Sequence, residues 1–299
     1  MRVIVTGCNG KLGRACVAAL QDVGHEVFGI DASPRADAGV PVHVGDLRES
    51  FTIHRAMDAF GGAPDALVHL ANHTNSYVAP EETVLRENIA MNTSAMLGAI
   101  RAGTHRVVFS SSVQAFLGGI NRGFKGGPPT YPAQLPVDEQ CEARPMNSYG
   151  LSKLMTEQML THLADAERFE TACSAASLRL PYILNQQSFE WATDKTGPSD
   201  YRWGGPEVFA YVHVDDAAAA VRMAVEADAT GHEVFWIAAP DPRPAESAEA
   251  LVDRYYSDVP GAAEAKARHT LVDTSKAQRL LGWRATRVLS EARTGATSA

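Results

Sequence analysis

A glycine-rich turn between a short strand and a helix is the feature of this chain that most constrains its fold. Residues 2–5 form a β-branched run typical of a buried strand, and glycines follow at Gly7, Gly10 and Gly13. From residue 12 onward, apolar side chains recur at helical spacing. Such a turn brings backbone N–H groups at a helix N-terminus close to a pyrophosphate, so it favours a dinucleotide as the ligand.

The spacing of these glycines leaves two interpretations open. It is Gly-x-x-Gly-x-x-Gly rather than Gly-x-Gly-x-x-Gly, and three glycines alone also fit a tight turn with close helix packing. A second expected strand, residues 26–30, ends on Asp31, about 20 residues after the turn. A carboxylate there accepts hydrogen bonds from the adenosine ribose and repels a 2′-phosphate. The sequence therefore predicts NAD rather than NADP.

The composition argues against several other classes of protein. The chain has 27 Lys and Arg against 35 Asp and Glu, a net charge of −8, and no dense basic run, so we expect no nucleic-acid partner. No apolar run approaches the ~20 residues of a membrane span, and the first strand begins at residue 2, so we expect neither a membrane partner nor a signal peptide. Cys8, Cys16, Cys141 and Cys173 show neither zinc nor disulfide spacing. We therefore expect ordinary buried or semi-buried thiols of a reducing compartment, no metal site and a cytoplasmic location.

Strands and helices alternate along the first 180 residues, which predicts an α/β fold with a Rossmann-type doubly wound parallel sheet. With 299 residues, 45% of them hydrophobic, the chain can bury a large core. We expect one α/β domain, or one such domain with a small appendage. The tail beyond residue 289 is small and polar, and we expect it to be frayed.

Three polar or irregular features allow more than one interpretation. Asp46 follows an expected strand, where its carboxylate either binds the adenine amino group or N-caps the helix expected over residues 50–60. His73 lies in a polar loop at the carboxyl end of the strand expected over residues 66–71; a lone loop histidine is usually a solvated bystander, and we assign it no role. Residues 117–137 are rich in glycine and proline, which indicates a lid, a subunit contact or a disordered loop.

The residues with recognisable chemistry are Ser112, Tyr149 and Lys153. Tyr149 and Lys153 are four residues apart on an expected helix, so their side chains share one face. A neighbouring ammonium, together with the positive charge of an oxidised nicotinamide, lowers the pKa of a phenol from its usual ~10 and makes it a usable acid or base. A serine at the end of a nearby strand can orient the substrate's hydroxyl. Tyr-x-x-x-Lys alone is common by chance on helices, so this motif depends on its context.

In combination, the motifs resemble those of the extended short-chain dehydrogenase/reductases, and the chain is similar to the NAD-dependent epimerase/dehydratase family along nearly its whole length. The shared features, in chain order, are the turn from Thr6 to Gly13, Asp31, Asp46, Leu47, residues 69–71, Asn88, residues 110–112, Tyr149, Ser152, Lys153, residues 273–277 and residues 281–283. The resemblance implies a catalytic hydroxyl at Ser112, an acid/base at Tyr149 and a ribose-holding group at Lys153. It also implies a homodimer through the helices at 81–101 and 149–163.

The resemblance implies that residues 1–180, continued by 208–240, form an NAD-binding domain, and that residues 181–207 and 241–290 form a small substrate-binding lobe. It also gives the expected binding residues. Asn88 is included among the cofactor-binding residues, and its expected role is to support the site structurally. The expected cofactor-binding residues are Gly7, Asn9, Gly10, Leu12, Gly13, Asp31, Asp46, Leu47, Leu70, Ala71, Asn88, Tyr149, Lys153 and Pro181. The expected substrate-binding residues are Asn75, Ser112, Tyr149, Tyr182 and Arg202. Trp191, Arg202 and Trp203 lie in the variable lobe, where they either contact substrate or pack the lobe.

Three departures from the family pattern bear on the substrate. The chain reads Val113-Gln-Ala after Ser112, where the family often has valine-tyrosine-glycine, and residues 117–137 lengthen the interval to Tyr149. Tyr182 stands where sugar-nucleotide enzymes place an asparagine. Only about thirty residues separate Pro181 from the segment at 212–216, a shorter interval than in sugar-nucleotide epimerases. These departures favour a smaller substrate.

Three functions follow. The preferred one is an NAD-dependent dehydrogenase that removes hydride from a secondary or anomeric hydroxyl of a small sugar or sugar acid. The second is a UDP-sugar 4-epimerase with tightly bound NAD, which would use the same three residues; Arg202, Arg222 and Arg243 are available cations for its pyrophosphate. The third is a non-catalytic NAD-sensing scaffold, which an intact Ser/Tyr/Lys set argues against.

Overall fold

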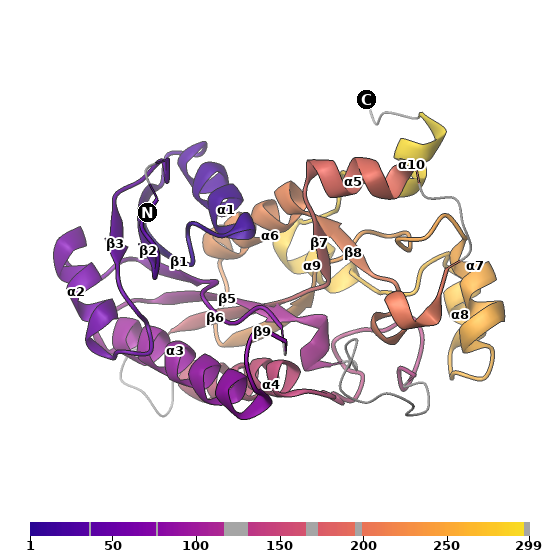
Figure 1. The fold of residues 1–299 in the computed structure, drawn as a ribbon, viewed down its shortest axis with the longest axis horizontal. Coiled ribbons are helices and arrows are strands. Elements are labelled where there is room, and N and C mark those ends of the chain that lie inside the picture. Colours follow the sequence, from indigo (N-terminus) through magenta and orange to yellow (C-terminus); the bar gives the residue numbers. More distant parts are fainter. Residues whose placement is uncertain (36, 76, 117–130, 166–172, 195–198, 296–299) are drawn as a thin grey trace.

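A seven-stranded parallel sheet forms the centre of the molecule (Figure 1), as the alternating pattern predicted. The computed structural model describes residues 1–299 except 36, 76, 117–130, 166–172, 195–198 and 296–299. The strands of the sheet are β1 (Arg2–Thr6), β2 (Glu26–Asp31), β3 (Val42–Val44), β4 (Ala66–His69), β5 (Arg106–Ser112), β6 (Ser174–Leu180) and β9 (His232–Trp236). Their order is β3-β2-β1-β4-β5-β6-β9, so the strand order reverses between β1 and β4, where open α/β sheets bind ligands.

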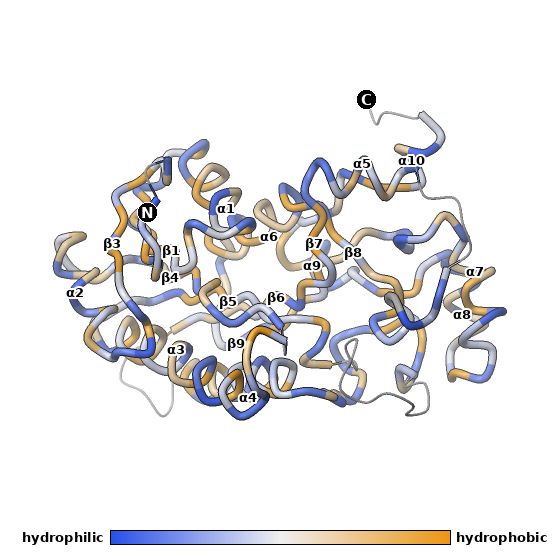
Figure 2. The backbone as a smooth tube through the Cα atoms, viewed as in Figure 1, coloured by the Kyte–Doolittle hydropathy of each residue, from blue (hydrophilic) through white to orange (hydrophobic). Residues whose placement is uncertain are grey.

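Helices cover both faces of this sheet. They are α1 (Lys11–Gln21), α6 (Val214–Glu226) and α9 (Ser275–Leu281) on one face, and α2 (Phe51–Phe60), α3 (Glu81–Arg101) and α4 (Ser148–Leu163) on the other. Figure 2 shows hydrophobic residues along the central strands and alternating with hydrophilic ones along the helices. No helix among the described residues is long and apolar enough to cross a bilayer.

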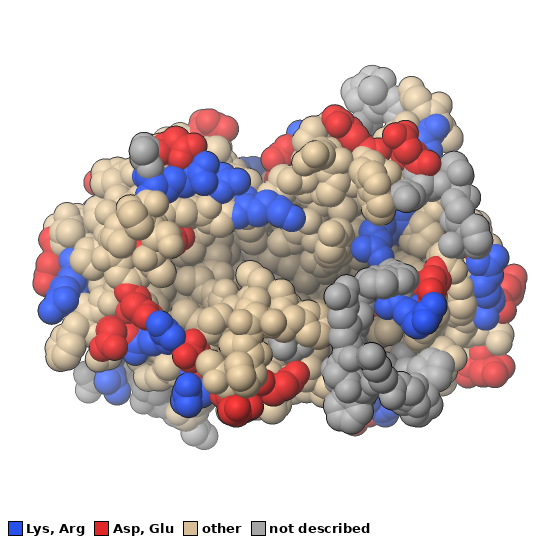
Figure 3. Space-filling model, in the orientation of Figure 1, with Lys and Arg blue, Asp and Glu red and all other residues tan. Residues whose placement is uncertain are grey.

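The remaining elements lie beside the carboxyl ends of the strands. A two-stranded parallel sheet pairs β7 (Tyr182–Leu184) with β8 (Tyr211–His213). Around it lie α5 (Gln186–Thr193), α7 (Ala248–Leu251), a π-helical turn (Val252–Tyr256), α8 (Ala262–Ala267), α10 (Leu289–Thr294) and the 3₁₀ turns η1 (Val113–Ala115), η2 (Tyr201–Trp203) and η3 (Gly205–Glu207). Figure 3 shows a hollow between these elements, on the right, and the sheet with its helices, on the left.

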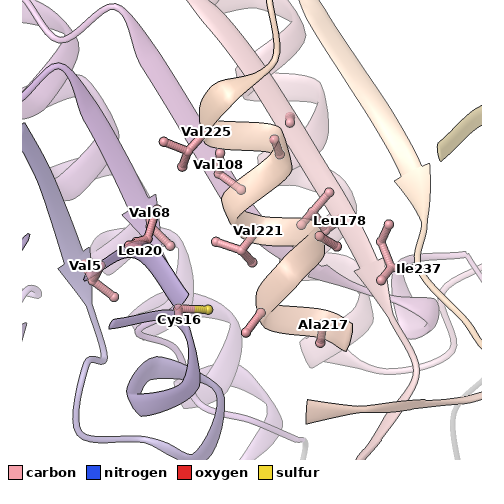
Figure 4. Packing of buried hydrophobic residues seen from close by; sticks show 14 of the residues in the cluster. Val5, Cys16, Leu20, Val68, Val108, Leu178, Ala217, Val221, Val225 and Ile237 are labelled. Atoms are coloured by element: carbon pink, nitrogen blue, oxygen red, sulfur yellow. The ribbon is translucent and has the colours of Figure 1, made fainter. Parts of the chain in front are cut away.

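Strand geometry divides the core into two layers. Along β1, Val3 and Val5 face α1 and α6, whereas Ile4 between them belongs to the cluster under α2, α3 and α4. In the first layer, Val221 of α6 packs among side chains of α1 and of the strands, including Leu20 and Leu178 (Figure 4). All four cysteines are buried free thiols, as the sequence predicted.

The C-terminal part contains more structure than its composition indicated. The expectation of a frayed tail beyond residue 289 is wrong for residues 290–294, because α10 continues to Thr294 and begins at the fully buried Leu289; residues 296–299 lie outside the described residues. The Arg293 guanidinium donates hydrogen bonds to the Pro244 and Arg243 carbonyls at 3.1 and 2.8 Å, which ties this helix to the loop after β9. Tertiary contacts therefore stabilise a segment whose local sequence favours no structure.

The glycine- and proline-rich insertion is described only at its C-terminal end; residues 117–130 lie outside the described residues. Leu135 and Val137 are buried, and their N–H groups donate to the Pro260 and Leu271 carbonyls at 2.8 and 2.9 Å. Residues 131–137 are thus packed against the C-terminal elements.

A buried chain of hydrogen bonds joins β1, β4, α3 and α4 beneath the strand ends. The Thr6 hydroxyl lies 2.8 Å from Nδ1 of His69, and Nε2 of His69 lies 2.9 Å from Oδ1 of Asn92. Asn92 Nδ2 donates to Thr156 Oγ1 at 2.7 Å. Because the Thr6 oxygen also accepts two backbone N–H bonds, its proton goes to Nδ1, and the neutral imidazole with the proton on Nε2 satisfies every partner.

The stability of the protein is expected to fall in mild acid because of His69. Burial lowers the pKa of His69 to about 4 from its usual 6.5. The unfolded chain takes up this proton below about 6.5 and the folded chain only below about 4. The stabilisation is therefore complete above pH 6.5 and is lost as the pH falls toward 4, by at most about 1.4 kcal/mol per pH unit. Urea unfolding at pH 7 and pH 5 should give a steeper pH dependence for the wild type than for His69→Gln; equal slopes would contradict the assignment.

Candidate active site

The glycine turn is closely packed against both of its neighbours. Gly7 has a φ of 67°, and a Cβ on it would lie 2.9 Å from the Ala71 nitrogen. A Cβ on Gly13 would lie 2.1 Å from the Gly7 oxygen. Close packing therefore requires glycine at both positions. The interpretation of the motif as a tight turn with close helix packing is thus correct, and it is compatible with nucleotide binding. Gly10, the N-cap of α1, provides no side-chain cap, which leaves the first N–H groups of the helix to a ligand. This cradle fits a pyrophosphate.

Asp31 lies beside this cradle at the end of β2. Its Oδ2 accepts a hydrogen bond from the Asn9 N–H at 3.0 Å and its Oδ1 one from the Ser33 N–H at 3.1 Å. These bonds hold the carboxylate at the wall of a cavity of about 620 Å³. Of the residues expected to bind cofactor, those lining it are Gly7, Asn9, Gly10, Asp31, Asp46, Leu47, Leu70 and Ala71.

Replacing Asp31 by alanine is expected to weaken NAD binding and to narrow the preference over NADP. The variant loses the acceptor for the ribose hydroxyls and the charge that repels a 2′-phosphate. Arg35, which also lines the cavity, would then face the phosphate. Dissociation constants for NAD and NADP, by protein fluorescence or calorimetry, check this. Asp37→Ala, which removes the ion-pair partner of Arg35 but keeps the Asp31 carboxylate, is the comparison variant and should leave NAD binding unchanged. A wild type that prefers NADP would contradict the role of Asp31.

Asp46 does not cap the helix that follows it. Its carboxylate accepts hydrogen bonds from the N–H and guanidinium of Arg48, the latter at 2.5–3.0 Å, and α2 has Ser50 at its N-cap. The N-cap interpretation is therefore wrong, because Asp46 lies too far ahead of the helix and is held by an ion pair. Arg48 continues the network to Glu87 at 2.8 Å, and Glu87 lies 2.7 Å from His73 Nε2.

A second cavity, of about 560 Å³, lies at the carboxyl ends of β1, β4, β5 and β6. It adjoins the first, because Gly7, Gly10, Leu70 and Asn72 line both. Of the expected site residues, those lining the second cavity are Gly7, Gly10, Leu12, Gly13, Leu70, Asn75, Ser112, Tyr149, Lys153, Pro181 and Tyr182. One continuous hollow therefore extends from Asp31 to Tyr149.

Ser112, Tyr149 and Lys153 meet in this second cavity. Lys153 is buried, and its Nζ donates to the Ser110 carbonyl at 2.8 Å and lies 5.5 Å from the centre of the Tyr149 ring. Burial raises the pKa of Tyr149 to about 12; its hydrogen bond with Ser112 lowers the pKa, and the charge of Glu207 raises it. Burial lowers the pKa of Lys153 to about 7, which the charge of Glu157 opposes. We expected the ammonium of Lys153 to help lower the pKa of the Tyr149 phenol. With only the chain's own groups acting, this pKa is raised instead, because burial of the phenol is the largest effect.

Asn88 lies beneath the cavity and does not line it. The buried amide accepts a hydrogen bond from the His73 N–H at 2.8 Å and donates one to the Ser152 hydroxyl at 3.1 Å. Ser152 in turn donates to the Tyr149 carbonyl at 2.7 Å. Asn88 therefore links the loop after β4 to the first turn of α4, consistent with a supporting role.

The candidate residues of the variable segment lie in different places, and of Tyr182 and Arg202 only Tyr182 lines one of the two cavities. Tyr182 is 53% exposed at the cavity, with the Arg243 guanidinium 5.0 Å from its ring centre. Arg202 lies outside both cavities; its side chain is 85% exposed and ion-paired with Asp200. Trp191 is 62% exposed on α5.

Gln114 and Glu207 line the second cavity and were not among the expected site residues. Gln114 Nε2 donates to Glu207 Oε1 at 2.9 Å, and Gln114 Oε1 accepts from Asn147, the N-cap of α4. Gln114 stands where the family often has tyrosine, and this departure was the sequence signal that could have identified it as a site residue. Glu207 gave none, because no motif surrounds it and only the fold brings it to Tyr149.

The fold and the nucleotide cradle define a Rossmann-type nucleotide-binding protein. The model of the NAD dependent epimerase/dehydratase family matches residues 3–238, and the chain belongs to this family. It is therefore an NAD-dependent enzyme.

Relatives of two activities resemble the chain. A UDP-glucose 4-epimerase of Azospirillum brasilense is 36% identical over 53% of this chain and 43% of its own length. A uronate dehydrogenase of Pseudomonas syringae pv. tomato is 29% identical over 62% of each chain. The matched part of this chain thus spans less than two thirds of either relative. The NAD complex of the UDP-glucose 4-epimerase of Thermus thermophilus has a TM-score of 0.67 at 19% identity and full coverage of both chains, which establishes a shared fold.

Proposed function

We propose that this enzyme is an NAD-dependent dehydrogenase that oxidises a secondary or anomeric hydroxyl of a small sugar or sugar acid. The supporting observation is the charge of the second cavity. Among the described residues that line it, the lysine and arginine side chains are Lys11, in the first turn of α1, and Lys153, beside Tyr149. The wall away from the cofactor cradle carries Glu207 instead, which is unsuited to the pyrophosphate of a nucleotide-sugar. A cavity of about 560 Å³ that must also admit the nicotinamide suits one sugar ring.

The chain's own residues would divide the chemistry as follows. Bound NAD supplies the hydride acceptor. Ser112 would hold the substrate's hydroxyl by hydrogen bonding, and Tyr149 would take its proton as the hydride leaves. Lys153, whose ammonium is already fixed by the Ser110 carbonyl, would hold the nicotinamide ribose and favour the phenolate. The first-turn N–H groups of α1 would bind the pyrophosphate, and Asp31 the adenosine ribose.

A turnover screen tests this function. Purified protein with NAD is offered free sugars and uronates in one set and UDP-sugars in another, and NADH formation and product identity are measured. Net NADH with a free sugar or uronate supports the dehydrogenase. Interconversion of UDP-sugars without net NADH would overturn it in favour of the epimerase, the second candidate, which the 36% identity to the Azospirillum epimerase favours.

We also propose a substrate-binding lobe, a homodimer and a cytoplasmic location for this protein. Segments 181–207 and 241–290 would serve as the substrate lobe. Helices α3 and α4 pack side by side, and α4 exposes Leu151 and Met155 four residues apart, which supports a homodimer through these helices. Light scattering of the wild type and of Met155→Glu would test the dimer. The four free thiols support a cytoplasmic location.

A further inference from the structure

A strained backbone segment brings a carboxylate into the second cavity. Val208 and Phe209 have φ values of 48° and 54°, the left-handed region that β-branched and bulky residues rarely adopt. The Phe209 N–H donates to the Gly204 carbonyl at 2.8 Å, and the Arg243 N–H donates to the Phe209 carbonyl at 2.9 Å, so the surroundings enforce this conformation. Glu207 immediately precedes the two residues. Backbone strain of this kind concentrates at functional sites.

The Glu207 carboxylate lies among groups of the proposed catalytic centre. It lines the same cavity as Ser112 and Tyr149, and its Oε1 accepts a hydrogen bond from Gln114 at 2.9 Å. Burial raises the pKa of Glu207, and the charge of Arg243 acts in the opposite direction. The carboxylate is thus partly desolvated, oriented by one amide, and close enough to Tyr149 to raise the pKa of the phenol.

A purely structural role does not account for this arrangement. A negative charge beside Tyr149 opposes formation of the phenolate that the proposed reaction needs. Even with the charge of Arg243 acting on it, a buried carboxylate that accepts one amide hydrogen bond is less favourable than a neutral side chain of the same shape. The cost of burial is offset when a ligand in the cavity donates further hydrogen bonds to the carboxylate, because such bonds are about twice as strong as neutral ones.

We propose that Glu207 is a substrate-binding, specificity-determining residue. Its carboxylate accepts hydrogen bonds from hydroxyl groups that neighbour the reacting carbon, and it selects a neutral aldose over the corresponding uronate. Gln114 is the positioning residue that orients Glu207. This proposal rests on the proposed dehydrogenase function and narrows its substrate class.

The test compares an aldose with its uronate in the wild type, Glu207→Gln and Glu207→Asp. Glu207→Gln should raise KM for the aldose about ten- to a hundredfold, as expected for a lost charge-assisted hydrogen bond, and should leave kcat within a few-fold. It should erode the preference for aldose over uronate. Removing the negative charge should also shift the rise of kcat/KM to lower pH, because the phenol of Tyr149 then ionises more readily. Glu207→Asp keeps the charge, so it should raise KM without that pH shift. Glu190→Gln, an exposed glutamate on α5, is the control.

An unchanged KM and pH profile in Glu207→Gln would overturn the proposal, as would a wild type that prefers the uronate. Failure of the proposed function has a different signature, namely no net NADH from the wild type with either sugar. In that case thermal shifts with NAD and each sugar still decide the role of Glu207. The variant should keep the stabilisation by NAD and lose the added stabilisation by aldose, and equal stabilisation of both proteins would overturn the role. If the wild type interconverts UDP-sugars, the same comparison of KM and pH profile is made with that substrate.

Discussion

Tyr149→Phe is expected to lower turnover by roughly 10²–10⁴ while leaving the fold and NAD binding intact. The substitution removes the oxygen that would take the substrate's proton and keeps the ring that packs near Lys153. The effect should fall on kcat and kcat/KM together, because a proton transfer is made only in the transition state. Steady-state NADH formation measures it, with the NAD dissociation constant measured in parallel.

The matched control is Tyr182→Phe, which removes a phenol that lines the same cavity but stands apart from the Ser112 hydrogen bond. This variant should change KM more than kcat. Undiminished turnover in Tyr149→Phe would exclude Tyr149 from the mechanism, whatever the substrate.

Glu157→Gln is expected to destabilise the fold by about 3–5 kcal/mol. Glu157 and Arg179 form an ion pair of 2.8 Å between side chains that are 5% and 6% exposed, and Ser111 donates a further hydrogen bond to Glu157 at 2.6 Å. The variant keeps an oxygen for Ser111 but leaves the Arg179 guanidinium buried without a counter-charge. Urea unfolding of the two proteins at one pH measures the difference.

The same substitution should also disturb the catalytic lysine. The charge of Glu157 is what opposes the effect of burial on Lys153, so its loss should lower the pKa of Lys153 below about 7. As control, Glu264→Gln breaks an exposed pair with Arg268 and should change stability by less than about 1 kcal/mol. An equal effect of the two variants would show that the buried pair contributes nothing particular.

Features set by short stretches of chain were predictable. The turn at Gly7, Gly10 and Gly13 and the carboxylate of Asp31 follow from a strand-turn-helix unit whose geometry is local, and α3 begins and ends at the residues expected, 81 and 101. Of the two roles that the sequence allowed for Asp46, the helix cap is excluded, because an ion pair with a near neighbour holds the carboxylate. Local signals failed at α10, which packing rather than propensity stabilises.

The sequence by itself determined the parallel Rossmann sheet and the nucleotide cradle, because hydrophobic period and glycine placement are properties of contiguous residues. Ser112, Tyr149 and Lys153 became candidates through the resemblance to the family, since Tyr-x-x-x-Lys alone is common by chance on helices. Only the tertiary structure decided what faces those candidates. Gln114 and Glu207, which the sequence did not put forward, are 93 positions apart and meet at 2.9 Å. Arg202, which was an expected substrate-binding residue, points into solvent instead. The balance of charge and desolvation around Tyr149 depends on such long-range neighbours. That balance is therefore determined by how the elements after β6 pack over the carboxyl ends of the strands.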